Sequence, residues 1–172
     1  MPSTRETTEA YFGAIARQDL DGMAAAWEPG STAVMFGMAE LRQPDDGVAW
    51  FGNLFRCFPD FSLKVEKLIV EGDSAAVHWS ATGTFDGEGL FEGLKPTGAT
   101  IAVDGIDIVT VADGRLTSLK ASINGMDLGR QVGALPPAGS PQDRIMTGAF
   151  NAKTVAVAKL RELAGSSRSR KG

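Results

Sequence analysis

Hydrophobic residues near the start of the chain follow a helical spacing. Within residues 7–28, the large apolar positions recur three to five residues apart: Tyr11, Ile15, Leu20, Met23 and Trp27. This spacing aligns them on one helix face. The segment 19–22, Asp-Leu-Asp-Gly, interrupts the pattern. Because Asp and Gly favour caps and turns, we expect two helices here rather than one.

The pattern then changes from helical to strand-like. Residues 33–38 form an apolar run typical of a buried strand, and residues 45–58 return to helical spacing, with Asp45 and Asp46 as candidate caps. Alternating or continuous apolar positions predict strands further along, over residues 61–65, 67–70, 75–85, 100–111 and 115–123. The glycine-rich residues 86–98 are expected to form a solvated flap. Helices followed by antiparallel strands indicate an α+β fold.

The C-terminal part differs from the rest in composition. Proline and glycine crowd residues 133–141, which predicts a linker. Residues 142–163 have helical spacing, and residues 165–172, rich in Ser, Arg and Lys, are expected to be disordered. We therefore predict a domain at residues 1–135, followed by linker, helix and basic tail over residues 136–172. The helix is expected to cover a pocket, pack on a partner subunit or dock on the sheet.

Composition and charge narrow the function classes. A chain of 172 residues with 43% hydrophobic and 22% charged residues fits one folded core-bearing domain. Its net charge of -4 disfavours a nucleic-acid partner. No apolar run reaches the roughly 20 residues that span a bilayer, and the polar start is unlike a signal peptide. We expect a cytoplasmic protein with no membrane partner.

The sequence contains few of the residue types that commonly act in catalysis or bind metals. Cys57 and His78 are the only residues of their types, which excludes an internal disulfide and a Cys/His zinc cluster. The sequence has no phosphate-binding loop, HExxH or CxxC motif. A nucleophilic triad would have to use His78, but a lone histidine on a strand is more often structural. We expect no metal and no cofactor.

Six short segments, taken in order and spacing, carry a resemblance to a known family. They are residues 11–27, 58–68, 81–84, 95–98, 112–116 and 128–133. Together they resemble the SnoaL-like polyketide cyclases of the nuclear transport factor 2-like superfamily, and residues 11–27 are especially similar to the first helices of ketosteroid isomerases. The resemblance implies a cone, in which a curved antiparallel sheet wraps on N-terminal helices around an apolar pocket. It also implies a homodimer that buries the outer sheet face.

The resemblance also implies site residues. Tyr11 falls where ketosteroid isomerases place an oxyanion-holding tyrosine, and Asp107 falls where they place a protonated aspartic acid beside it. A phenol and a neutral carboxylic acid directed at one carbonyl oxygen would stabilise negative charge there. Asp107 can donate in this way only if burial raises its pKa.

Three positions depart from the family pattern. Met35 occupies the position of the isomerase base, Phe85 that of a histidine common in the cyclases, and Asn124 that of their acid/base aspartate. None of these side chains exchanges a proton at neutral pH. Asp127 would substitute as acid/base if the chain bends there; otherwise it caps a helix, and Asn124 is a turn residue before Gly125.

Aromatic residues are expected to line much of the pocket, because core and pocket wall share one face in a cone. The expected substrate-binding residues are Met35, Trp50, Phe55, Trp79 and Phe85.

The function implied is that of a cofactor-independent cyclase or isomerase acting on a small, apolar, carbonyl-bearing substrate of polyketide type. Tyr11 and Asp107 would polarise a carbonyl that Asn124 orients. Either Asp107 or Asp127 transfers a proton in an aldol-type closure, or hydrogen bonding alone accelerates a pericyclic closure. The alternatives are a non-catalytic ligand-binding or dimerisation module, and an epoxide hydrolase or ketosteroid isomerase-like enzyme.

Overall fold

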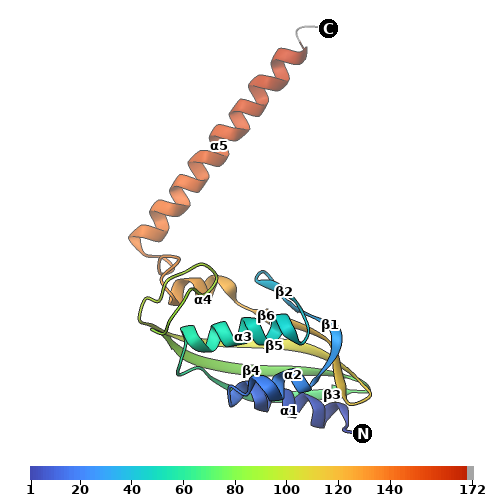
Figure 1. Cartoon of the computed structure of the whole chain (residues 1–172). Helices are drawn as coiled ribbons and strands as arrows, with labels where there is room; N and C mark the ends of the chain where they lie inside the picture. Colours follow the sequence, from blue (N-terminus) through green and yellow to red (C-terminus); the bar gives the residue numbers. More distant parts are fainter. Residues whose placement is uncertain (170–172) are drawn as a thin grey trace. The chain divides into compact units, whose positions relative to one another are not determined.

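The structure is a computed structural model that describes residues 1–169, with side chains described to residue 161. The chain divides into two units, Met1–Ala134 and Leu135–Gly172. The helices of the first unit are α1 (Thr4–Ala16), α2 (Leu20–Ala25), α3 (Asp45–Cys57) and α4 (Gly125–Gln131). Its strands are β1 (Trp27–Met35), β2 (Ala39–Arg42), β3 (Ser62–Glu71), β4 (Ser74–Phe85), β5 (Ala99–Ala112) and β6 (Arg115–Ile123). The second unit contains α5 (Pro141–Ser169) (Figure 1).

The six strands form one sheet in the order β2-β1-β6-β5-β4-β3. The neighbouring strands are antiparallel except β1 and β6, which are parallel. The sheet curves, and α1, α2 and α3 lie over one of its faces (Figure 1). The predicted α+β fold, with a curved sheet on N-terminal helices, is confirmed. The parallel pair is a departure from the all-antiparallel sheet that we expected.

A hairpin formed by β1 and β2 replaces the single strand predicted at residues 33–38. Pro29 and Gly30, which favour a break, lie inside β1, where Gly30 has a φ of 85° and the register with β6 shifts. The chain therefore absorbs these two residues in an irregular strand instead of ending the strand there.

Helix caps explain where the N-terminal helices begin. Asp19 caps α2, because its Oδ1 accepts a hydrogen bond of 2.9 Å from the Gly22 backbone, so the predicted division into two helices is confirmed. The prediction that Asp45 or Asp46 caps α3 is wrong. Both residues lie in the first turn of α3, after Pro44, where their negative charges interact favourably with the positive end of the helix dipole.

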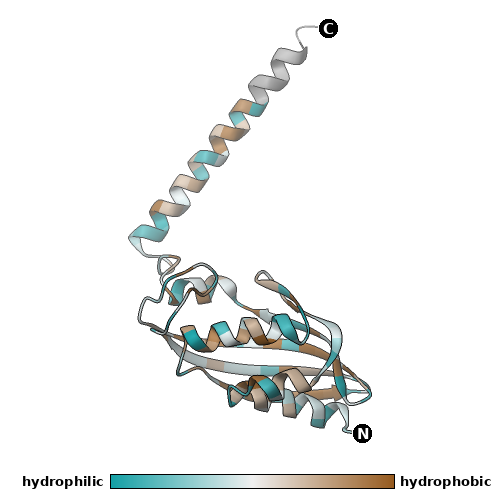
Figure 2. Ribbon diagram, in the orientation of Figure 1, coloured by the Kyte–Doolittle hydropathy of each residue, from teal (hydrophilic) through white to brown (hydrophobic). Residues whose placement is uncertain are grey.

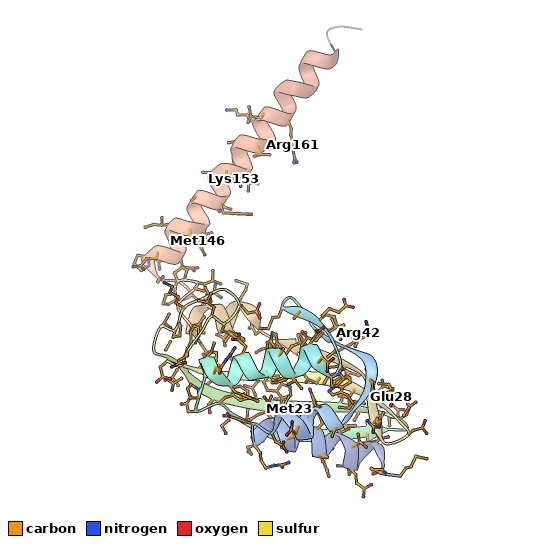
Figure 3. All side chains as sticks on the ribbon, viewed as in Figure 1. Met23, Glu28, Arg42, Met146, Lys153 and Arg161 are labelled. Carbon is orange, nitrogen blue, oxygen red and sulfur yellow. The ribbon has the colours of Figure 1, made fainter. Side chains whose placement is uncertain are left out.

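Alternation along β5 separates the inner sheet face from the outer one. Val103, Asp107 and Val109 are buried, whereas Ile106 and Ile108 are exposed. Of the side chains labelled in Figure 3, Met23 on α2 is buried, whereas Glu28 on β1 and Arg42 on β2 are exposed. The homodimer implied by the resemblance would cover the exposed isoleucines, and it stays a prediction.

The glycine-rich loop packs more closely on α3 than a solvated flap would. The backbones of Gly87 and Glu88 donate hydrogen bonds of 3.0 and 2.9 Å to the carbonyls of Cys57 and Arg56. A side chain at Gly87 would collide with the Arg56 carbonyl, so only glycine allows this approach. The loop thereby buries Phe91 to 5% exposure.

The second unit consists mainly of α5, which continues to Ser169, beyond the predicted end at residue 163. The structure includes residues 165–169 in this helix, and Ser and Arg continue a helix at modest cost. The expected disorder of the basic tail stays a prediction. Residues 170–172, the rest of that expected tail, lie outside the described residues. Hydrophobic and hydrophilic bands alternate along α5 (Figure 2), and Ile145, Phe150 and Leu160 are exposed. Among the residues that the structure describes, no helix combines the length and apolar character needed to cross a membrane.

Candidate functional site

A deep apolar cavity lies between the helices and the inner face of the sheet. The cavity offers about 90 Å³ to water molecules, and the unfilled space in and around it, adjoining open solvent included, is about 910 Å³. Since a water molecule needs about 10–15 Å³ of the first measure, the cavity has room for a ligand of one or two rings. Three of its lining side chains, Tyr11, Gln43 and Asp107, are buried and polar or ionisable.

Asp107 projects from β5 into this cavity and is only 6% exposed. Its Oδ1 accepts a hydrogen bond of 2.9 Å from Trp79 Nε1 on the adjacent strand β4. Burial raises the pKa of Asp107 from 3.8 to about 7, and the Trp79 hydrogen bond acts in the opposite direction. Asp107 can therefore both take and return a proton near neutral pH.

Gly105 makes room for the indole that holds Asp107. It pairs with Trp79 in the β4–β5 register, and a Cβ at this position would collide with the Trp79 ring. The indole thus lies flat over β5, with its N–H directed at the carboxyl group two residues further along the strand.

Tyr11 reaches the same cavity from α1. Its ring packs edge to face against Phe12 and Trp27, with centroid separations of 5.5 and 5.7 Å. Burial raises the pKa of Tyr11 above its ordinary value, a hydrogen bond with Trp27 lowers it, and the charge of Asp107 raises it further. The phenol therefore stays protonated at neutral pH and can donate a hydrogen bond to a ligand oxygen.

The comparisons with known proteins agree with this geometry. A model of the SnoaL-like domain matches residues 8–119. The chain belongs to the SnoaL-like domain family. No curated protein matches it.

Solved structures resemble this SnoaL-like domain over most of their own length. AclR from Streptomyces galilaeus, described as "a putative hydroxylase", is 26% identical, with a TM-score of 0.67 over 77% of this chain and 97% of its own. A "putative SnoaL-like polyketide cyclase" from Jannaschia sp. CCS1 is 24% identical, with a TM-score of 0.68 over 77% and 93%. IdmH from Streptomyces antibioticus, "a putative polyketide cyclase", is 21% identical, with a TM-score of 0.66 over 77% and 99%. The nuclear transport factor 2-like fold is therefore confirmed.

The cavity wall of the SnoaL-like domain includes three of the five expected substrate-binding residues: Met35, Trp50 and Trp79. Phe55 and Phe85 do not line it. Phe85 is fully buried and stacks on Phe58 at a centroid distance of 4.8 Å. Phe55 packs among other aromatic rings of the core. Alternation placed Phe85 on the inner face, but Phe58 lies between it and the cavity.

Asn124 and Asp127 do not reach the cavity of the SnoaL-like domain. Asn124 caps α4, accepting a hydrogen bond of 3.1 Å from the Asp127 backbone, and Asp127 accepts one of 2.7 Å from Gln131 Nε2. Both residues are exposed. The structure places both residues at the N-terminus of α4, a helix that the sequence did not predict, and outside the cavity lining. Their expected roles in orienting a substrate and transferring a proton stay predictions.

Among the cavity residues of the SnoaL-like domain that the sequence analysis did not assign to the site, two lie outside every predicted helix and strand and are nevertheless buried. Phe91 lies in the glycine-rich loop, and Gln43 follows β2 directly before Pro44. Both are buried, at 5% exposure. Neither belongs to a periodic segment, so no hydropathy pattern indicates their burial. The described residues also contain no group of three or more His, Cys, Asp or Glu side chains that could hold a metal ion.

Replacing Trp79 by Phe is expected to raise the pKa of Asp107 further, by about one pH unit, because the carboxylate loses a hydrogen-bond donor. The pH dependence of Asp107-dependent proton transfer measures this shift. Trp50→Phe is the matched control, since the Trp50 indole donates to Glu92 Oε1 at 3.2 Å instead. Equal pH midpoints in the two variants would contradict the assigned role of Trp79.

Proposed function

We propose that this SnoaL-like domain is a cofactor-independent cyclase or isomerase acting on a small, apolar, carbonyl-bearing compound of polyketide type. One observation carries the proposal: Asp107, with a pKa of about 7, lies in an apolar cavity that Tyr11 also lines. The polyketide cyclases named among the structural relatives support the substrate class.

In the proposed mechanism, ionised Asp107 takes a proton from the carbon next to a substrate carbonyl. The electron pair of the broken C–H bond forms an enolate, whose oxygen accepts a hydrogen bond from the Tyr11 hydroxyl. In a cyclase, the enolate carbon then attacks a second carbonyl, and protonated Asp107 returns its proton to the new alkoxide. In an isomerase, the proton returns to a different carbon. Either way, Asp107 ends in its starting state.

Proton transfer is favoured over a pericyclic closure by the position of Asp107. A pericyclic reaction needs donors to a carbonyl and no acid/base group. A group with a pKa near the working pH gains most as a general acid/base. The departures at Met35, Phe85 and Asn124 favoured the pericyclic route in the sequence, but Asp107 itself supplies the acid/base that those positions lack.

Exchange of the α-protons of 2-tetralone with D₂O, followed by NMR, tests the first step without knowledge of the natural substrate. Tyr11→Phe is expected to slow the catalysed exchange by about 10²-fold, because the enolate loses one hydrogen-bond donor. Binding of 2-naphthol, a planar mimic of the enolate, is followed by tryptophan fluorescence.

If the wild-type protein binds 2-naphthol but catalyses no exchange, the proposed enzymatic activity is contradicted. The alternative of a non-catalytic ligand-binding module is then favoured. Equal exchange rates for wild type and Tyr11→Phe would remove the tyrosine from the mechanism and leave Asp107 as the acid/base.

A further inference from the structure

Gln43 is a buried polar residue of the cavity that the proposed mechanism leaves without a role. Its backbone is fixed at the end of β2, where its N–H donates to the Ser31 carbonyl at 2.8 Å and its carbonyl accepts from the Gly30 N–H at 2.9 Å. The residue is 5% exposed and lines the cavity together with Tyr11 and Asp107. Both backbone groups are therefore satisfied, and only the side chain remains to be explained.

The carboxamide of Gln43 makes no hydrogen bond to any residue in the described part of the chain. Its oxygen and nitrogen are not among the fully covered side-chain atoms that lack a partner in the described residues, so they adjoin space that water or a ligand can enter. The packing of the neighbouring helix α3 leaves room for the Gln43 amide. A Cβ at Gly47, in the first turn of α3, would collide with the Gln43 amide. An unpaired amide held in a ligand-sized cavity is consistent with a group that pairs only when a ligand enters.

The positions of the cavity's polar groups indicate what such a ligand carries. In the proposed function Tyr11 binds one substrate oxygen and Asp107 acts on the carbon beside it. Gln43 adds a polar group from a different element, the segment between β2 and α3. A carboxamide both donates and accepts, so it can bind a carbonyl or a hydroxyl. The remaining lining is largely apolar.

We propose that Gln43 is a specificity-determining residue whose carboxamide hydrogen-bonds a second oxygen of the substrate. The substrate class is then a one- or two-ring apolar compound, or a chain of similar size, that carries two oxygen functions. This inference rests on the proposed function for the assignment of the first oxygen. A site with a buried amide rejects a ligand that lacks the second oxygen, because the amide then stays unpaired.

The test compares the affinity of 2-naphthol, which has one oxygen, with those of 2,3-, 2,6- and 2,7-dihydroxynaphthalene, which add a hydroxyl at three different distances. For the wild-type protein, at least one of the three is expected to bind about tenfold to hundredfold more tightly than 2-naphthol. In Gln43→Met, which keeps the size and removes the amide, this ratio is expected to fall to about one.

Gln131→Met is the matched control. The Gln131 amide is paired with both backbone groups of Ala102, at 2.6 and 3.0 Å, and lies outside the cavity lining. This variant is expected to lose thermal stability and to keep the affinity ratio. Gln43→Met is expected to keep or gain thermal stability, since the amide that it loses has no partner in the free protein.

The proposal is overturned if no dihydroxynaphthalene outbinds 2-naphthol, or if the advantage survives in Gln43→Met. Its failure is separable from that of the proposed function. If the wild-type protein catalyses exchange of the 2-tetralone protons but its affinity ratio does not depend on Gln43, only this inference is removed. If the affinity ratio depends on Gln43 but no exchange is catalysed, only the proposed enzymatic activity is removed.

Discussion

Asp107→Asn is expected to slow the catalysed exchange of 2-tetralone protons by about 10³-fold, within the range typical of a lost general acid/base. Asn has nearly the same shape as Asp, and its Oδ1 can still accept the 2.9 Å hydrogen bond from Trp79. The cavity should therefore keep its form and its affinity for 2-naphthol. The proton acceptor alone is removed, and the exchange rate measured by NMR reports that loss.

The control for this experiment lies on the same strand. Asp104 is exposed on the outer sheet face, where its Oδ1 lies 3.2 Å from His78 Nε2. Asp104→Asn removes one carboxylate from β5 without touching the cavity, so the exchange rate is expected to stay within about twofold of wild type. Similar losses in both variants would mean that the effect comes from the charge of the strand and not from proton transfer at Asp107.

Local sequence patterns predicted most of the helices and strands of the fold. Asp19 indicated the division between α1 and α2, and alternation indicated the long strands β4, β5 and β6. The short elements were not predicted. β2 spans four residues, too few for a recognisable period, and α4 follows an Asn-Gly pair that is also typical of a turn. Such elements are specified by the sheet they pack on.

The candidate site was predictable only in part, for a related reason. Tyr11 and Asp107 lie on regular elements, so a resemblance of sequence segments was enough to place them in one cavity. Gln43 and Phe91 reach the cavity from irregular segments, whose paths depend on contacts far along the chain, such as that between Gly30 and Gln43. Asn124 lies outside the cavity lining, because its side chain accepts a hydrogen bond within the first turn of α4.

The free energy of unfolding is also expected to depend on pH through the ionisation of Asp107. Its pKa is about 7 in the folded protein and about 3.8 when exposed, so the folded state binds this proton more tightly than the unfolded state. Stability contributed by a raised pKa is complete below pH 3.8 and is lost as pH rises to 7. The loss is about 1.4 kcal/mol per pH unit over this window, or about 4 kcal/mol in total.

Asp107→Asn cannot ionise and should not undergo this loss, so between pH 4 and pH 8 it is expected to gain about 4 kcal/mol of stability relative to wild type. Urea unfolding followed by fluorescence measures this difference, because all three tryptophans lie in the first unit. Contributions from exposed carboxylates such as Glu6 and Asp60 cancel in the comparison. Parallel stability profiles would mean that Asp107 is ionised in the folded protein at all these pH values. A variant that is more stable at pH 8 yet inactive would instead identify the buried carboxyl as a group kept for chemistry at a cost in stability.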